Sequence, residues 1–240
     1  MNRSNTDCPR AGEPSGRLCK TVLVSVLSGG VLMVAGCGAP FETRVPDVVL
    51  TPAHIVFMPV VTKAYEIDFD DRVKRKSQSA QTMATYFNAE IAAQATRRGA
   101  SLFSPENLQG CDDSCIELLA SFVRWGVNAS MEIAARGRAD YGKYSVGSWE
   151  ARRDYEPLRS ALKADFALIV VVRDAQETSG RVVGNFFAGV DTYFKRVAVA
   201  CVAEFLYGRM VWCHSEVDFL GNLQDPRTTH NLVLRLLSDL

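Results

Sequence analysis

The sequence predicts an α/β (α+β) fold: a single mixed β-sheet of about five strands with helices packed on it, ending in a hairpin and then a helix. Three observations lead to this prediction. Residues 77–98 repeat Met83, Phe87 and Ile91 at helical spacing. Residues 166–172 are seven consecutive apolar residues, typical of a strand covered on both faces. Two further apolar segments, 197–206 and 210–217, meet near Gly208, which can supply a positive φ.

The first part of the predicted domain contains a strand, a charged loop and the longest helix. Residues 54–61 (HIVFMPVV) are rich in β-branched residues, and Pro59 predicts an edge or a bend. Adjacent blocks of opposite charge at 65–76 predict a solvated loop. The helix at 77–98 is expected to begin with a Ser77 or Ser79 cap and to end at Gly99. A short strand is expected at 100–104.

The middle and end of the chain are predicted as follows. A helix at 114–125 is expected to stop at Gly126, and the alternation of apolar and polar residues at 127–135 predicts a strand. An alternative is that 127–135 continues the helix, if Gly126 is tolerated. The remaining expected elements are a loop or small hairpin at 137–150, a helix at 151–164, a polar turn at 173–180, and a final helix that reaches Leu240. The final helix is expected to be capped by Thr228 or Thr229. Its expected buried residues are Leu232, Val233 or Leu234, Leu236 and Leu237.

The segment 21–37 (TVLVSVLSGGVLMVAGC) has the order of a secretory signal: basic residues, a short apolar run, then small residues. The preceding basic residues are Arg3, Arg10, Arg17 and Lys20. The apolar run of about 15 residues is shorter than the roughly 20 that a membrane-spanning helix needs. A single uncleaved anchor helix is the alternative interpretation.

The end of this segment, Val34, Ala35, Gly36 and Cys37, resembles the lipobox of bacterial lipoproteins. The resemblance implies that residues 1–36 are removed as a signal peptide and that the Cys37 thiol carries acyl chains. The expected organisation is a lipidated cysteine with an extended, proline-containing tether at 37–52 and one globular domain at 53–240. In these lipoproteins an aspartate after the cysteine favours the inner membrane. Gly38 in that position therefore implies the periplasmic face of the outer membrane.

Charge and cysteine content narrow the possible partners. The chain has 27 basic and 27 acidic residues, which argues against a nucleic-acid partner. Four cysteines remain after the predicted leader and the lipidated position: Cys111, Cys115, Cys201 and Cys213. In an exported chain they are expected to form two local disulfides, Cys111 with Cys115 and Cys201 with Cys213, the latter pair as diagonal neighbours. Free buried thiols are the alternative, and the spacing disfavours a metal site.

The sequence contains no motif from which a cofactor, a metal or a catalytic residue is predicted. Residues 137–143 fit the start of a phosphate-binding loop, but Tyr144 stands where a serine or threonine would hold Mg²⁺. His214 alternates with Trp212 and Glu216 and could orient a substrate, although a solvent-facing histidine is the favoured interpretation. The glycine- and aromatic-rich segment 184–194 is a binding lip, a membrane-dipping or oligomer contact, or a connection whose aromatic residues cover the sheet.

Two sequence features of the predicted domain resemble the small α/β domain of envelope lipoproteins: Ala164-Asp165 before the apolar strand, and Gly208 to Trp212 at the hairpin turn. Examples are the penicillin-binding-protein activator LpoB, the curli secretion lipoprotein CsgG and the TolB N-terminal domain. The resemblance covers residues 55–240, with Glu204 as a loose match to an acidic position. The long hairpins of the curli pore are missing.

The sequence therefore predicts a lipid-anchored, non-enzymatic envelope protein that binds an envelope protein partner or supports assembly. The alternatives are a cell-wall-acting hydrolase and an oligomeric secretion-complex subunit, and a homo-oligomer remains open.

Overall fold

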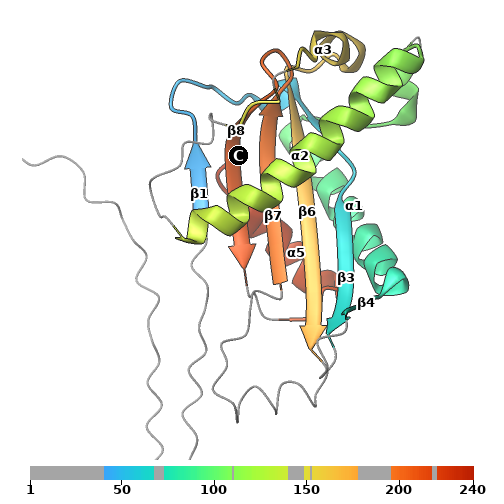
Figure 1. The fold of residues 1–240 in the computed structure, drawn as a ribbon, viewed down its shortest axis with the longest axis vertical. Helices are drawn as coiled ribbons and strands as arrows, with labels where there is room; N and C mark the ends of the chain where they lie inside the picture. The colour runs from blue at the N-terminus through green and yellow to red at the C-terminus, as the bar shows by residue number, and fades with distance from the viewer. Residues whose placement is uncertain are drawn as a thin grey trace, which may run out of the picture. The chain divides into compact units, whose positions relative to one another are not determined.

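One mixed β-sheet with helices on both faces forms the core of the described part of the chain (Figure 1). The computed structural model describes residues 41–67, 73–109, 111–139, 149–151, 153–177, 196–217 and 221–240. The predicted fold class is confirmed, with a sheet of eight strands rather than about five. Residues 38–240 make up one compact unit. No helix in the described ranges is long and apolar enough to cross a membrane.

The sheet is built around β6, the longest of its strands. The strands are β1 (Phe41–Arg44), β2 (Ile55–Phe57), β3 (Val61–Ile67), β4 (Val73–Arg75), β5 (Ser101–Leu102), β6 (Phe166–Glu177), β7 (Arg196–Glu204) and β8 (Arg209–Val217). Their order is β1-β8-β7-β6-β2-β5, with β3 also on β6 and β4 on β3. β6 is antiparallel to β7 and parallel to β2 and β3. The polar turn predicted from residue 173 is therefore wrong up to Glu177, because these residues continue β6.

The strand predicted at 54–61 is interrupted. β2 and β3 both pair with β6, and residues 58–60 separate them. Pro59 has no N–H for the ladder, and the N–H of Val60 donates instead to Oδ1 of Asn88 at 2.8 Å. β3 and β4 form an antiparallel pair in the segment predicted as a solvated loop. That prediction is therefore wrong for 65–67 and 73–75.

β1 lies in the segment predicted to be an extended tether. Its residues pair with β8, from Phe41 opposite Ser215 to Arg44 opposite Trp212. The N–H of Val45 continues this ladder to the carbonyl of Val211 at 2.8 Å. The chain is therefore already part of the sheet at residue 41, before the predicted domain boundary at 53.

α1 (Ser77–Arg98) and α5 (Pro226–Leu236) cover one face of the sheet. α1 has the predicted bounds, and Gly99 ends it in the left-handed region at φ 69°. The predicted caps are wrong for both helices. Lys76 precedes α1 without a side-chain cap, and the α5 cap is Asp225, whose carboxylate accepts a hydrogen bond from the N–H of Thr228 at 2.9 Å. The helix predicted to reach Leu240 ends at Leu236.

α2 (Asp113–Ala139) crosses the other face as one continuous helix (Figure 1). The strand predicted at 127–135 is therefore wrong, and so is the loop at 137–139. A Cβ atom added at Gly126 would lie 2.1 Å from Cδ1 of Ile169 on β6. Glycine at this position therefore lets the helix approach the sheet closely, and it is not the helix stop that was expected from the sequence.

α3 (Glu156–Leu162) lies on the same side as α2 and is shorter than the predicted helix at 151–164. Two cysteine couples lie at disulfide distance, in the expected local pairing. Cys111 and Cys115 have Cα atoms 5.4 Å apart, and Cys201 and Cys213 have Cα atoms 4.1 Å apart. The second couple is directly opposite across β7 and β8, not diagonal as expected.

Candidate binding pocket at one end of the sheet

A pocket of about 370 Å³ opens at the end of the sheet where β6 begins and β7 ends. Three separate parts of the chain contribute side chains to it. Its lining residues are Val49, Thr51 and His54 from the segment between β1 and β2, Arg159, Asp165 and Phe166 from α3 and the start of β6, and Glu204 and Leu206 from the end of β7 and its turn.

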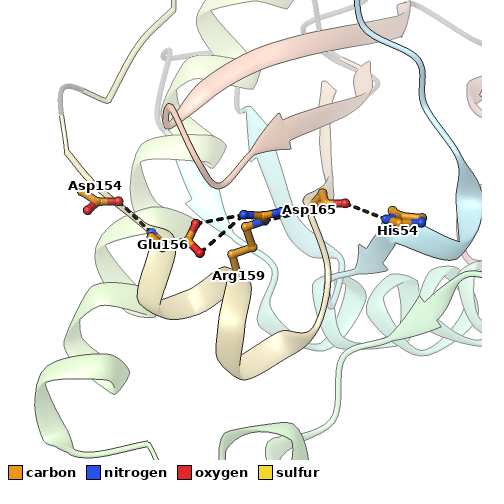
Figure 2. A network of polar contacts seen from close by, with 5 residues as sticks. All are labelled: His54, Asp154, Glu156, Arg159 and Asp165. Atoms are coloured by element: carbon orange, nitrogen blue, oxygen red, sulfur yellow. Dashed lines mark hydrogen bonds and ion pairs between the residues drawn. The ribbon is translucent and has the colours of Figure 1, made fainter.

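Three of the lining residues, His54, Asp165 and Arg159, form a polar network (Figure 2). Nδ1 of His54 donates to Oδ2 of Asp165 at 2.6 Å, and Nε of Arg159 donates to Oδ1 of the same carboxylate at 2.7 Å. Each carboxylate oxygen of Asp165 therefore has its own charged or ionisable partner. Because Nδ1 of His54 is occupied in this way, its Nε2 is left for a ligand.

Backbone hydrogen bonds fix the position of Asp165. Its N–H donates to the carbonyl of His54, and its carbonyl accepts from the N–H of Phe205, both at 3.0 Å. Asp165 thus joins the residue before β2 to the residue after β7. The side-chain bond between His54 and Asp165 follows from this pairing, because it places both side chains at the same end of neighbouring strands.

The short helix α3 brings Arg159 to the network. The carboxylate of Asp154 accepts a hydrogen bond from the N–H of Glu156 at 2.8 Å at the start of the helix (Figure 2). Lys163, at φ 51°, ends the helix, and its N–H donates to the carbonyl of Arg159. This tight turn returns the chain to Asp165 within two residues, so Arg159 and Asp165 meet.

The network holds its charges in the ionised state. The hydrogen bond from Arg159, followed by that from His54, lowers the pKa of the Asp165 carboxyl below its ordinary value. The bond to Asp165, followed by that to Glu156, raises the pKa of the Arg159 guanidinium. The Asp165 carboxylate is therefore an acceptor at neutral pH and keeps the His54 ring oriented.

Exposed apolar side chains lie beside the charged groups. Val49 is 80% exposed, Leu206 41% and Tyr207 60%. On the same side, Nε of Arg209 donates to Oε2 of Glu204 at 2.7 Å, and its guanidinium lies over the Tyr207 ring at 5.2 Å. Paired charges and exposed aliphatic and aromatic side chains therefore lie together at this end of the sheet.

The predicted site residues lie elsewhere or outside the described part. His214 does not line the pocket and is only 7% exposed, so the solvent-facing interpretation is wrong. Its ring nitrogens have no hydrogen-bond partner among the described residues, and Glu216 and Asp239 approach them at 3.9 Å and 4.0 Å. The lipobox residues Val34, Ala35, Gly36 and Cys37, the segment 184–194 and most of the phosphate-loop candidate lie outside the described residues.

Sequence reasoning missed the pairing of His54 with Asp165. Asp165 belongs to the Ala164-Asp165 dipeptide that carried the resemblance, but nothing in the sequence linked it to a histidine 111 residues away. Within the described residues, no group of three or more histidine, cysteine, aspartate or glutamate side chains could hold a metal ion.

Comparisons with known proteins give little beyond this geometry. No protein-family model matches the chain, and no curated protein matches it. Among solved structures, the chain is similar to the PelC dodecamer from Paraburkholderia phytofirmans, with a TM-score of 0.38 and 9% identity over 84% of this chain and 96% of the PelC chain. A point variant of the same dodecamer gives a TM-score of 0.36 and 8% identity over the same shares. Likenesses of this size support no functional conclusion.

Proposed function

We propose that this protein is a lipid-anchored envelope protein whose pocket end binds a protein partner without catalysing a reaction. Acyl chains on Cys37 hold it at the periplasmic face of the outer membrane. The lipobox-like residues 34–37, which follow a basic and then an apolar segment, support the anchor. More than one acyl chain is needed for stable anchoring, and lipoprotein processing supplies several.

The observation that carries the proposal is the position of the pocket relative to the point at which the chain enters the sheet. Phe41 lies opposite Ser215, which pairs with Val199, and Val199 pairs with Val171. The pocket lies at Phe166, which comes five residues before Val171 in β6. At the rise of a β-strand, this places the pocket about 17 Å from the level of Phe41. Because β1 runs towards the pocket end, the chain from Cys37 approaches from the opposite end.

This arrangement suits a protein that presents its pocket to a partner. A fully extended chain of four residue steps covers no more than about 14 Å, which sets the upper limit on the length of chain between Cys37 and Phe41. The apolar side chains of Val49, Leu206 and Tyr207 are left accessible at the pocket end.

Two experiments in the native host test the two halves of the proposal. Mass spectrometry of the native protein should find an acylated Cys37 as the first residue, and an intact leader would contradict the anchor. A photo-crosslinking amino acid at position 206 should trap one defined envelope protein. The matched control is position 116 on α2, where Ile116 is similarly exposed at 49%. Equal products from both positions, or none from 206, would contradict the partner-binding role.

One observation favours a hydrolase as the second candidate. Nδ1 of His54 pairs with a carboxylate, and its Nε2 has no hydrogen-bond partner among the described residues, which is the arrangement of the histidine and aspartate in a catalytic triad. Among the described residues that line the pocket, Thr51 carries the only hydroxyl group. If the protein hydrolyses envelope material, His54→Ala and Thr51→Val should both abolish its cellular role, whereas a binding protein should tolerate Thr51→Val.

A further inference from the structure

A second surface lies at the other end of the sheet, on the face that α2 crosses. It consists of Lys63 and Tyr65 from β3, Arg75 from β4 and Arg173 from β6, and we call it the cationic face. Lys63 pairs with Arg173, and Tyr65 pairs with Arg75. Directly paired residues, and residues two apart on one strand, point to the same side of a sheet. These four side chains therefore share one surface.

Among the described residues, the cations of this face have no carboxylate partner. Lys63, Arg75 and Arg173 are exposed, and no ion pair joins them to a carboxylate within the described ranges. The guanidinium of Arg173 lies over the Tyr65 ring, 5.5 Å from its centroid. Of the acidic residues of the same strands, Glu66 and Asp174 alternate to the opposite face, whereas Glu177, the last residue of β6, has the strand parity of Arg173.

The two acidic residues on that opposite face already have partners. Glu66 pairs with Lys76. Oδ1 of Asp174 lies 2.9 Å from Nε of Arg196. Residues 68–72, outside the described part, contain three aspartates and one arginine. Membrane binding is therefore to be measured on the whole mature chain.

The cationic face lies at the end of the sheet where the chain from Cys37 enters. Phe41 is level with Val171 through the pairings across β8 and β7. Arg173 lies two residues further along β6, in the direction away from the pocket. Because β1 and β6 run in opposite directions (Figure 1), Phe41 at the start of β1 lies towards the same end of the sheet as Arg173 and Lys63, with β8 and β7 between β1 and β6.

We propose that the cationic face binds the anionic phospholipid headgroups of the membrane that holds Cys37. This inference rests on the proposed lipid anchor, because the anchor brings this end within a Debye length or two of the membrane surface. Each basic side chain close to an anionic membrane raises binding about fivefold at low salt, so three together contribute about 100-fold. Tyr65 and the exposed Val73 on β4 add the amphipathic surface typical of a membrane interface. The lipid and the cationic face together would fix the orientation of the pocket.

The test uses the chain from residue 37 onward with Cys37→Ser, which is the mature protein without its lipid. Its binding to phosphatidylcholine vesicles is compared with binding to vesicles that also contain phosphatidylglycerol. We expect binding only to the anionic vesicles, weakening as salt rises. The variant Lys63→Gln/Arg75→Gln/Arg173→Gln should lose about 100-fold in affinity. The matched control is Arg124→Gln/Lys163→Gln/Arg227→Gln, which removes three exposed cations elsewhere and should bind as the parent does.

Equal losses in the two variants, or equal binding to neutral and anionic vesicles, would overturn the role of the cationic face. Circular dichroism of both variants shows whether they keep the fold. Mass spectrometry of the native protein distinguishes failure of the lipid anchor from failure of the cationic face. An unmodified Cys37 in the native protein would contradict the proposed function while leaving the vesicle result to stand on its own.

Discussion

Nδ1 of His54 lies 2.6 Å from Oδ2 of Asp165, although 111 residues separate them in the sequence. The same aspartate accepts a hydrogen bond from Arg159, and its backbone links the start of β2 to the end of β7. One residue therefore organises both the pocket and the strand ends around it. Its substitution is expected to affect stability as well as binding.

The variant Asp165→Asn should lower the free energy of unfolding at pH 7 by about 1 kcal/mol, because two charge-assisted hydrogen bonds weaken. The folded-state pKa of Asp165 is lowered, first by Arg159 and then by His54. Its contribution is therefore complete above the unfolded pKa of about 3.9 and is lost as pH falls through the folded value. Urea unfolding between pH 7 and pH 3 should show a smaller acid-induced loss in the variant.

The control for this titration is Asp47→Asn, since Asp47 is exposed and lies between β1 and the pocket. It should leave the unfolding free energy at pH 7 unchanged. The same acid profile in Asp165→Asn and in the parent would contradict the assigned role of Asp165.

Gly126→Ala should destabilise the protein by about 1–3 kcal/mol through overpacking, even though alanine favours a helix. The new methyl group would lie 2.1 Å from Cδ1 of Ile169, which is buried in the sheet. Adding Ile169→Val removes that Cδ1 atom and should restore most of the loss. Urea unfolding of the two single variants and the double variant measures this coupling. Additive losses would show that the contact does not cause the effect.

The two cysteine couples should differ in their contribution to stability. In the chain-entropy model, linking residues 12 apart, as in Cys201–Cys213, contributes about 3 kcal/mol, and linking residues four apart, as in Cys111–Cys115, contributes about 2 kcal/mol. Alanine replacement of each couple, followed by urea unfolding, should show the larger loss for the couple in β7 and β8. The reverse order would contradict this model.

Arg98 joins the end of α1 to the end of α5. Its Nη1 donates to the backbone oxygen of Leu240 at 2.8 Å, and its Nη2 donates to that of Leu237 at 2.7 Å. Arg98→Ala should destabilise by about 1–2 kcal/mol and speed hydrogen exchange after residue 233. Arg98→Lys should recover only part, because a single ammonium group cannot reproduce both bonds. Unchanged exchange in the alanine variant would contradict this role.

The sequence predicted those elements whose residue pattern fits only one type of secondary structure. The apolar spacing in residues 77–98 fits a helix and no strand, and it predicted α1. The continuous apolar run from residue 166 predicted the central strand. α2 was misinterpreted because a glycine followed by alternating residues fits both a strand and a helix that buries several sides. Only the position of Ile169 reveals that Gly126 is a packing contact.

The elements and contacts that were missed depend on distant partners. β1 (FETR) has one large apolar residue and becomes a strand because the edge of β8 is free to pair with it. The pocket assembles His54, Arg159 and Glu204 from segments that no local pattern connects. The sequence could identify the Ala164-Asp165 dipeptide by resemblance, but its hydrogen bonds exist only after the sheet has formed.

The antiparallel pairing of β1 with β8 also bears on how mechanical load would pass through an anchored protein. Interstrand hydrogen bonds stand perpendicular to the strands. A pull on the chain from Cys37 would act along the axis of β1, so the bonds between Phe41–Arg44 and β8 would resist in shear, sharing the force rather than opening one after another. A four-residue strand at the edge of the sheet can in this way act as the attachment that keeps the folded body tethered under tension.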